Sequence, residues 1–291
     1  IVGGGYVGLE IGMVYAALGS RITLVEVGDR LLPGVDTDLV APLKKRLDQQ
    51  FETLLFNSRV TGLDTATRGV DVKVEGAGGA TSLAVDRVLV AIGRRPNTEA
   101  LGLESTGVQL DERGFIKVDN QQRTSLPHIY AVGDIVGGVM LAHKAMVEGK
   151  IAAEVIAGRP SAFDVQAIPA VVYTDPQIAW AGITEEEARQ QGLAVAVERF
   201  PWKFSGRALT TGTPTGLTKM IIDAGTRRVL GVGIAGRGAE GLIAEGVLAI
   251  EMGALAEDVA LSMHAHPTLS ETEGETADIF LGAATHILPK D

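Results

Sequence analysis

The sequence predicts an α/β protein with more than one domain, and three observations support this. The chain has 291 residues, near the upper size that one hydrophobic core usually serves. Its 46% hydrophobic and 21% charged residues are typical of a globular protein. Strand-like and helix-like runs alternate at the start of the chain, whereas the last third combines a strand pair with helices.

The first elements form a strand, turn, helix and strand. Residues 6–18 predict a helix that ends at Gly19, and residues 21–27 predict a buried strand. Glu26 lies at the end of that strand, 23 positions after the first glycine of the turn. The turn itself carries the pattern GxGxxG, at Gly3, Gly5 and Gly8.

This arrangement predicts a Rossmann-like dinucleotide-binding domain. Glycines let the backbone approach a pyrophosphate, and the helix N-terminus offers unpaired N–H groups to it. Glu26 is placed to accept hydrogen bonds from ribose hydroxyls, and its charge would repel a 2′-phosphate, so NAD is favoured over NADP. The alternative is a packing turn of glycines beside a solvated glutamate.

The start of the chain is short for this fold. Only Ile1 and Val2 precede Gly3, whereas a strand of about five residues is expected there. We therefore expect that residues are missing upstream.

Later elements follow from periodicity and turn signals. A capping box from Thr184 to Glu187 predicts a helix start, and a glycine-rich turn at residues 76–79 predicts a hairpin connector. Further helices are predicted over residues 37–49, 142–157 and 240–252. Further strands are predicted over residues 70–75, 87–92, 115–118, 128–132, 170–173, 218–223 and 229–235.

The segment HAHPTLSE, residues 264–271, carries candidate acid/base groups. His266 is followed five positions later by Glu271 across a proline, which suits an imidazole oriented and kept basic by a carboxylate. A structural histidine is the alternative interpretation. A metal site is not expected, because there is no cysteine and no third histidine close to His264 and His266.

Composition excludes several classes of function. The net charge of −10, from 26 Lys+Arg and 36 Asp+Glu, argues against nucleic-acid binding. No apolar run approaches the roughly 18 residues of a membrane span, and the N-terminus lacks the features of a signal peptide, so a cytoplasmic location is expected. The absence of cysteine excludes disulfide and thiol chemistry on these residues.

Five motifs occur in one order over nearly the whole chain, and together they resemble the flavin-dependent pyridine-nucleotide disulfide oxidoreductases. The motifs are GGGYVGLE at residues 3–10, AIGRRPN at 91–97, T-x6-A-x-G-D ending at Asp134, MLAH at 140–143, and HAHPTLSE.

The resemblance implies three domains and a set of site residues. Residues 1–94 would form the NAD-binding domain, 95–165 a central segment that completes an FAD domain, and 166–291 an α+β interface domain that builds a homodimer. His266 and Glu271 would transfer protons to and from the partner subunit's dithiol. The residues implied to bind NAD are Gly3, Gly5, Tyr6, Gly8 and Glu26. Those implied around FAD are Asp134, Met140, Leu141, Ala142 and His143, and Gly93 is also implied to bind a cofactor.

Within the family, HAHPTLSE, FPWKFSGRA at residues 200–208 and Glu26 favour the branch that oxidises protein-bound dihydrolipoamide and reduces NAD. The partners of that branch are the lipoyl domains of 2-oxoacid dehydrogenase or glycine cleavage complexes. The family's redox-active cysteines and its upstream FAD-binding motif are missing here, so the chain alone is expected to be inactive. The alternatives are a glutathione-reductase-like or mercuric-reductase-like enzyme, or a non-catalytic fragment that dimerises and binds NAD.

Overall fold

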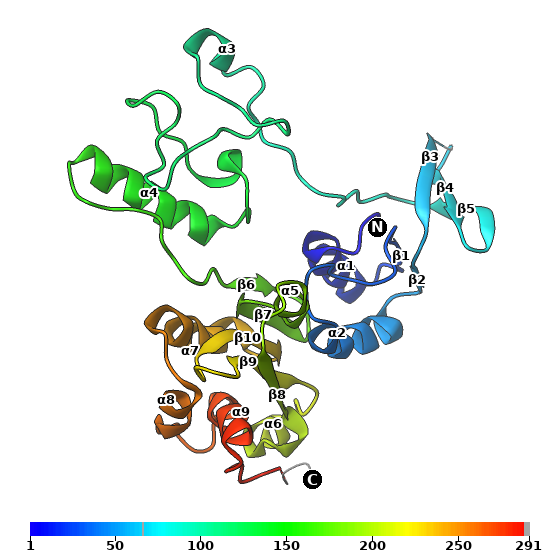
Figure 1. Ribbon diagram of the computed structural model, residues 1–291. Coiled ribbons are helices and arrows are strands. Elements are labelled where there is room, and N and C mark those ends of the chain that lie inside the picture. Colours follow the sequence, from blue (N-terminus) through cyan, green and yellow to red (C-terminus); the bar gives the residue numbers. More distant parts are fainter. Residues whose placement is uncertain (66, 288–291) are drawn as a thin grey trace. The chain divides into compact units, whose positions relative to one another are not determined.

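The computed structural model describes residues 1–65 and 67–287 of the chain, which form two compact units. One unit contains residues 1–92 together with the residues from 169 onward, and the other contains residues 93–168. Figure 1 shows the elements of both units. Among the described residues, no helix is long and apolar enough to cross a membrane.

The glycine turn lies between short parallel pairings in the first unit. Strands β1 (Thr23–Val25) and β2 (Thr53–Leu55) pair in parallel, and Val2 forms single parallel bridges to Val25 and Val90. Helix α1 (Tyr6–Ala17) follows the turn, as predicted. The prediction of a strand over residues 87–92 is wrong. This segment forms only one bridge, between Val90 and Val2, and a strand needs a longer ladder.

A three-stranded antiparallel sheet follows, with the order β3, β4, β5. Its strands are β3 (Arg59–Thr65), β4 (Val70–Gly76) and β5 (Gly79–Val85). Gly76 pairs with Gly79, which confirms the predicted hairpin turn, but the strand after it is β5 and not the predicted strand over residues 87–92.

The rest of this unit is built on a five-stranded antiparallel sheet in the order β6, β7, β10, β9, β8. Strands β9 and β10 form the predicted hairpin, whereas β7 and β8 were not predicted. The strands are β6 (Ala170–Val172), β7 (Gln177–Gly182), β8 (Val195–Pro201), β9 (Leu217–Asp223) and β10 (Val229–Gly236).

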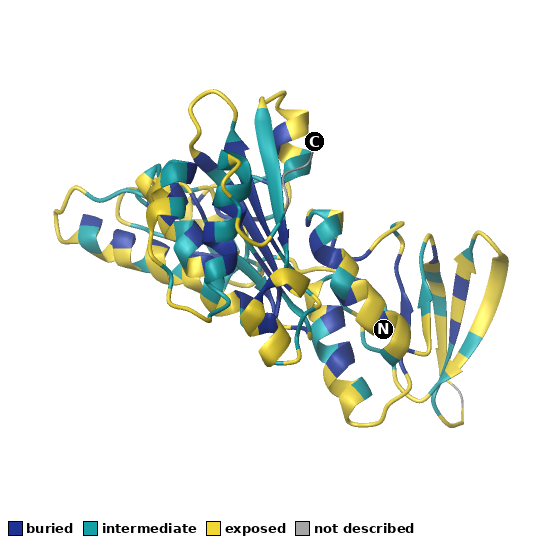
Figure 2. Ribbon diagram, turned by 90° about the horizontal axis from the view of Figure 1, so that it is seen from below, coloured by how far each residue is buried: buried dark blue, intermediate teal, exposed yellow. Residues whose placement is uncertain are grey.

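Helices cover both faces of this sheet. Helix α7 (Ala239–Met252) packs on β7 and β10, and α9 (Glu271–Leu281) packs on β8 and β9. Helix α2 (Thr37–Gln50) packs on β7 and β10 from the opposite face. Successive residues of β10 point to opposite faces: Gly233 lies against Leu39 of α2, whereas Val232 lies against Gly246 of α7. Buried residues gather on the sheet and on the helix faces turned toward it (Figure 2).

Helix α2 shares one hydrophobic core with the sheet. Its buried side chains recur at helical spacing, and they pack together with Val172, Ile178 and Ala235 of the sheet. Those side chains are Leu39, Val40, Leu43 and Leu47. Apolar packing therefore holds α2 against the sheet.

Short helices complete the described part of this unit. The predicted capping box is confirmed at Thr184, whose hydroxyl accepts the N–H of Glu187 while the Glu187 carboxylate accepts the N–H of Thr184. The helices are α5 (Glu185–Gln190), η2 (Trp202–Phe204), α6 (Gly206–Thr210) and α8 (Ala256–Leu261).

The second unit has little regular structure besides α3 (Leu103–Thr106), η1 (Gly133–Val136) and the predicted helix α4 (Ala142–Ile156). The strands predicted over residues 115–118 and 128–132 are wrong, because these segments form only single bridges. The chain before each segment folds into a tight turn, in which the carboxylate of Asp111 or Asp119 accepts two backbone N–H groups.

Candidate functional site

The three glycines of the GxGxxG pattern differ in why they are glycine. A Cβ on Gly3 would lie 2.4 Å from the carbonyl oxygen of Ala91, and one on Gly8 would lie 2.3 Å from that of Gly3. Both positions therefore need glycine for packing. A Cβ on Gly5 would meet no atom within 4 Å, and its φ of −79° suits any residue. No contact among residues 1–65 and 67–287 requires glycine at position 5.

Helix α1 begins directly after Gly5. Gly5 is the N-cap of α1, no side chain caps the helix, and there is no acidic residue in its first turn. Tyr6 begins the helix and is partly exposed. A helix N-terminus that no side chain of the helix caps suits an anion such as a pyrophosphate.

Glu26 closes the other side of the turn. One of its carboxylate oxygens accepts the N–H of Gly4 (2.6 Å) and the other accepts the N–H of Gly28 (2.6 Å), and the residue is only 8% exposed. Each oxygen keeps a second acceptor position. Glu26 therefore holds the glycine turn in place, a role that the sequence analysis missed although Gly4, the middle one of three consecutive glycines, was visible in the sequence.

A second group of predicted residues lies in the other unit. The Arg94 guanidinium donates to the carboxylate of Asp134 (2.7 Å) and to the carbonyl oxygen of Met140 (2.6 Å), so it joins these two residues. Leu141 is the N-cap of α4 and has no side-chain cap, and α4 begins with Ala142 and His143. The structure thus brings Asp134 and residues 140–143 together, with Gly93 next to Arg94 at a φ of +127°.

A buried ion pair fixes the spacing within this group. Lys144 and Glu148 are both buried and paired on α4. The Glu148 carboxylate also accepts the N–H of Gly133 (2.7 Å), and the Lys144 ammonium donates to the carbonyl oxygen of Gly137 (3.2 Å). Both ends of η1 are therefore tied to α4.

His266 and Glu271 form a hydrogen-bonded pair. Nδ1 of His266 lies 2.8 Å from Oε1 of Glu271, and the other oxygen of Glu271 accepts the N–H of Thr268 (2.6 Å). Burial would raise the pKa of Glu271, but the Thr268 N–H and His266 outweigh it and hold the pKa below its ordinary value. Glu271 is therefore ionised at neutral pH. The His266 side chain is 75% exposed, so its Nε2 is accessible to a substrate.

His264, in the same segment, forms a second histidine–glutamate pair. Nε2 of His264 lies 2.7 Å from Oε1 of Glu245 on α7, and the ring lies so close to Gly274 that a Cβ there would be 3.0 Å from Nδ1. Glu273 on α9 is 1% exposed, and neither of its oxygens has a hydrogen-bond partner among the described residues. Burial, with a smaller contribution from the charge of Glu245, raises the pKa of Glu273 to about 9.

No group of three or more His, Cys, Asp or Glu side chains within residues 1–65 and 67–287 is arranged to hold a metal ion.

Residues 1–149 match the model of the pyridine nucleotide-disulphide oxidoreductase family, and residues 168–277 match the dimerisation domain of the same family. The chain belongs to this family. Its sequence is 48% identical to the dihydrolipoyl dehydrogenase of Haemophilus influenzae over 99% of this chain and 60% of the relative. It is 44% identical to the dihydrolipoyl dehydrogenase of Geobacillus stearothermophilus over 100% of this chain and 62% of the relative.

Solved structures agree with this assignment. LpdA from Mycobacterium tuberculosis superimposes with a TM-score of 0.89 and 28% identity, over 96% of this chain and 60% of that one. RclA from Escherichia coli, described as an HOCl-induced flavoprotein disulfide reductase, gives a TM-score of 0.87 and 28% identity over 95% of this chain and 63% of that one. The chain spans about 60% of the length of the curated relatives it matches.

Proposed function

We propose that this chain supplies the NAD-binding, proton-transfer and dimerisation parts of a dihydrolipoyl dehydrogenase, which oxidises protein-bound dihydrolipoamide and reduces NAD. The observation that carries the proposal is the His266–Glu271 pair. An ionised carboxylate holds Nδ1 of His266, so Nε2 can take the proton of a dithiol that is being oxidised. Lipoyl domains of 2-oxoacid dehydrogenase or glycine cleavage complexes would present that dithiol.

The chain's residues also fit the two cofactors of this reaction. Gly3, Gly5, Gly8 and Glu26 would hold NAD at the open N-terminus of α1, with Tyr6 at its edge. Asp134 and residues 140–143 offer a carboxylate and an uncapped helix start, which suit the hydroxyl groups and ring edge of FAD. FAD, when bound, supplies the two-electron relay between thiols and nicotinamide.

The proposed homodimer would cover an apolar surface of the interface domain. Leu248 and Met252 are exposed on α7, and Leu261 and Met263 are exposed shortly after it in the sequence. Exposed apolar patches commonly mark protein interfaces. We therefore place the subunit contact on these residues.

The test is a substrate comparison with the protein as it is encoded, loaded with FAD. Dihydrolipoamide should support NADH formation, whereas glutathione disulfide and mercuric ion should be poor substrates with NADH or NADPH. Residues 1–291 alone contain no cysteine to form a redox disulfide, so they should not catalyse the reaction. Faster turnover of glutathione disulfide or mercuric ion than of dihydrolipoamide would contradict the proposal.

Replacing Gly5 by alanine should weaken NADH binding while leaving the fold intact. The backbone accepts alanine here and the Cβ meets no protein atom, but it would occupy the space proposed for the pyrophosphate. We expect at least about a tenfold loss of affinity, equal to roughly 1.4 kcal/mol. Fluorescence titration with NADH measures it. Gly149→Ala, at another open glycine position, is the matched control, and equal affinities for the two variants would exclude the pyrophosphate from Gly5.

Replacing Glu26 by glutamine and Val27 by arginine should narrow the preference for NADH over NADPH. The exchange removes a charge that repels the 2′-phosphate and adds a cation at an exposed neighbour. The ratio of the two dissociation constants is the measurement. Val14→Arg is the control: it adds the same charge at an exposed position of α1 and should leave the ratio of the dissociation constants unchanged. An unchanged ratio in the double variant would place Glu26 away from the ribose.

A further inference from the structure

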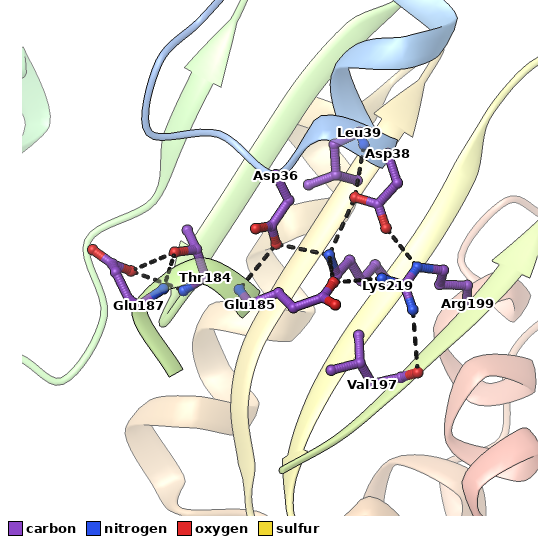
Figure 3. A network of polar contacts seen from close by, with 9 residues as sticks. All are labelled: Asp36, Asp38, Leu39, Thr184, Glu185, Glu187, Val197, Arg199 and Lys219. Carbon is purple, nitrogen blue, oxygen red and sulfur yellow. Dashed lines mark hydrogen bonds and ion pairs between the residues drawn. The ribbon is translucent and has the colours of Figure 1, made fainter. Parts of the chain in front are cut away.

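A buried lysine lies at the centre of an ion cluster in the first unit (Figure 3). The Lys219 ammonium contacts carboxylate oxygens of Asp36 (2.8 Å), Asp38 (3.1 Å) and Glu185 (2.7 Å). Arg199 also binds Asp38 and Glu185. We call these five residues the Lys219 cluster. Lys219 is 1% exposed, and a buried ammonium is costly unless carboxylates such as these pair with it.

The Lys219 cluster joins the dinucleotide half of the chain to the dimerisation half. Asp36 and Asp38 lie at the start of α2, whereas the other three residues lie on α5 and on two neighbouring strands of the five-stranded sheet. Arg199 and Lys219 are register partners across β8 and β9, so both cations reach the same carboxylates. One oxygen of Asp36 also accepts the backbone N–H of Glu185 (3.1 Å). The start of α2 is therefore attached to the sheet at several points.

The Lys219 cluster has one carboxylate more than it has cations. Three carboxylates face two cations. Burial would raise the pKa of Asp38, but Arg199 and Lys219 outweigh burial and lower this pKa. The outer part of the cluster borders a cavity of about 610 Å³, where Arg199 and Glu185 retain contact with solvent. Loss of Lys219 would leave three carboxylates with a single cation, so the start of α2 would be repelled from the sheet.

Residues 32–36, which end at Asp36, also contact the glycine turn. The N–H of Leu32 donates to the carbonyl oxygen of Gly4 (3.0 Å), and the N–H of Val35 donates to that of Leu32 (3.0 Å). Leu32 has a φ of +49°, which a leucine adopts only when its surroundings impose it. Asp36 follows Val35 directly. A shift of Asp36 would therefore be transmitted through Leu32 to Gly4, the residue that Glu26 also holds.

We propose that Lys219 is a positioning residue for the dinucleotide site: it anchors Asp36, so that Leu32 stays bonded to Gly4 and the glycine turn keeps its binding shape. The inference rests on the proposed NAD-binding function. It makes nucleotide affinity depend on a residue of the dimerisation half of the chain, which acts through Asp36 and Leu32 on Gly4.

The experiment replaces Lys219 by methionine, which keeps the alkyl chain and removes the charge. In the protein as it is encoded, we expect the NADH dissociation constant of the folded fraction to rise between about threefold and thirtyfold. Hydrogen exchange at the Leu32 amide should accelerate by a similar factor. Lys219→Arg should recover part of both effects. Lys44→Met removes an exposed lysine that pairs with Asp48 on α2, and it should change neither.

The outcomes separate this inference from the proposed function. A Lys219→Met protein that unfolds more easily but binds NADH with the original affinity would overturn the positioning role. Wild-type protein that binds no NADH would overturn the proposed function, and amide exchange at Leu32 would still test the anchor. If Lys219→Met does not fold, Asp36→Asn carries the test, because it keeps the side-chain size and one acceptor oxygen. It should weaken NADH binding at least about threefold, and unchanged binding would refute the proposal.

Discussion

Replacing His266 by alanine is expected to lower dihydrolipoamide turnover by about 10²–10⁴-fold, the usual range for loss of a general acid or base. The pair geometry gives the reason: Glu271 is ionised and holds Nδ1, so the exposed Nε2 is the group that can accept a thiol proton. The measurement is the steady-state rate of NADH formation in the FAD-loaded protein as it is encoded.

Two comparisons make this test specific. Glu271→Gln should lose less activity than His266→Ala, because glutamine removes the charge that supports the imidazole but leaves the imidazole itself. Oxidation of NADH by an artificial acceptor that bypasses the disulfide should be largely retained in both variants. If both activities fell equally, His266 would have a folding or dimerisation role instead of a proton-transfer role.

Features set by neighbouring residues were predictable from the sequence. The capping box at Thr184 and Glu187 and the hairpin from Gly76 to Gly79 each depend on residues three positions apart, and the structure has both. His266 and Glu271 are also close in sequence, and a proline turn brings them into contact. The glycine turn followed only in part for this reason, because the steric demand at Gly8 comes from Gly3, whereas that at Gly3 comes from the distant Ala91.

Features that depend on distant residues were not predictable. Lys219 is separated from Asp36 by 183 positions and from Glu185 by 34, and no local pattern marks a lysine that will be buried. The strands wrongly predicted in the second unit failed because of nearby residues, not distant ones. Their sequences favour extended backbone, but a strand also requires a partner of matching length, and turns at Asp111 and Asp119 use the nearby backbone N–H groups instead.

Glu273 shows the same limit. Glu273 lies in the acidic first turn of α9, a helix that the sequence analysis did not predict, and a solvated glutamate is the ordinary outcome at such a position. Only the packing of α9 on the sheet shows that this carboxyl group points inward, near Glu245 and without a hydrogen-bond partner among the described residues.

We expect Glu273→Gln to stabilise the protein by an amount that grows with pH. Burial raises the folded-state pKa of Glu273 from 4.5 to about 9. Below pH 4.5 both the folded and unfolded states hold the proton, so the raised pKa has no cost. Between the two values only the unfolded state ionises, and stability falls by up to about 1.4 kcal/mol per pH unit. Glutamine does not titrate, so its advantage over glutamate should increase from pH 5 to pH 9 and then level off.

Urea denaturation at fixed protein concentration and at pH 5, 7 and 8.5 measures this advantage. The difference between Glu273→Gln and wild type should reach several kcal/mol at pH 8.5, since the unfolded state gains stability with each unit above 4.5. Glu273→Met should add a further gain of about 1–3 kcal/mol that does not vary with pH, because it also removes the unpaired buried polar atoms. Glu240→Gln, an exposed site on α7, should change the free energy of unfolding by less than about 0.5 kcal/mol at each pH. A stabilisation by Glu273→Gln that is the same at all three pH values would mean that Glu273 titrates in the folded protein as it does in the unfolded chain.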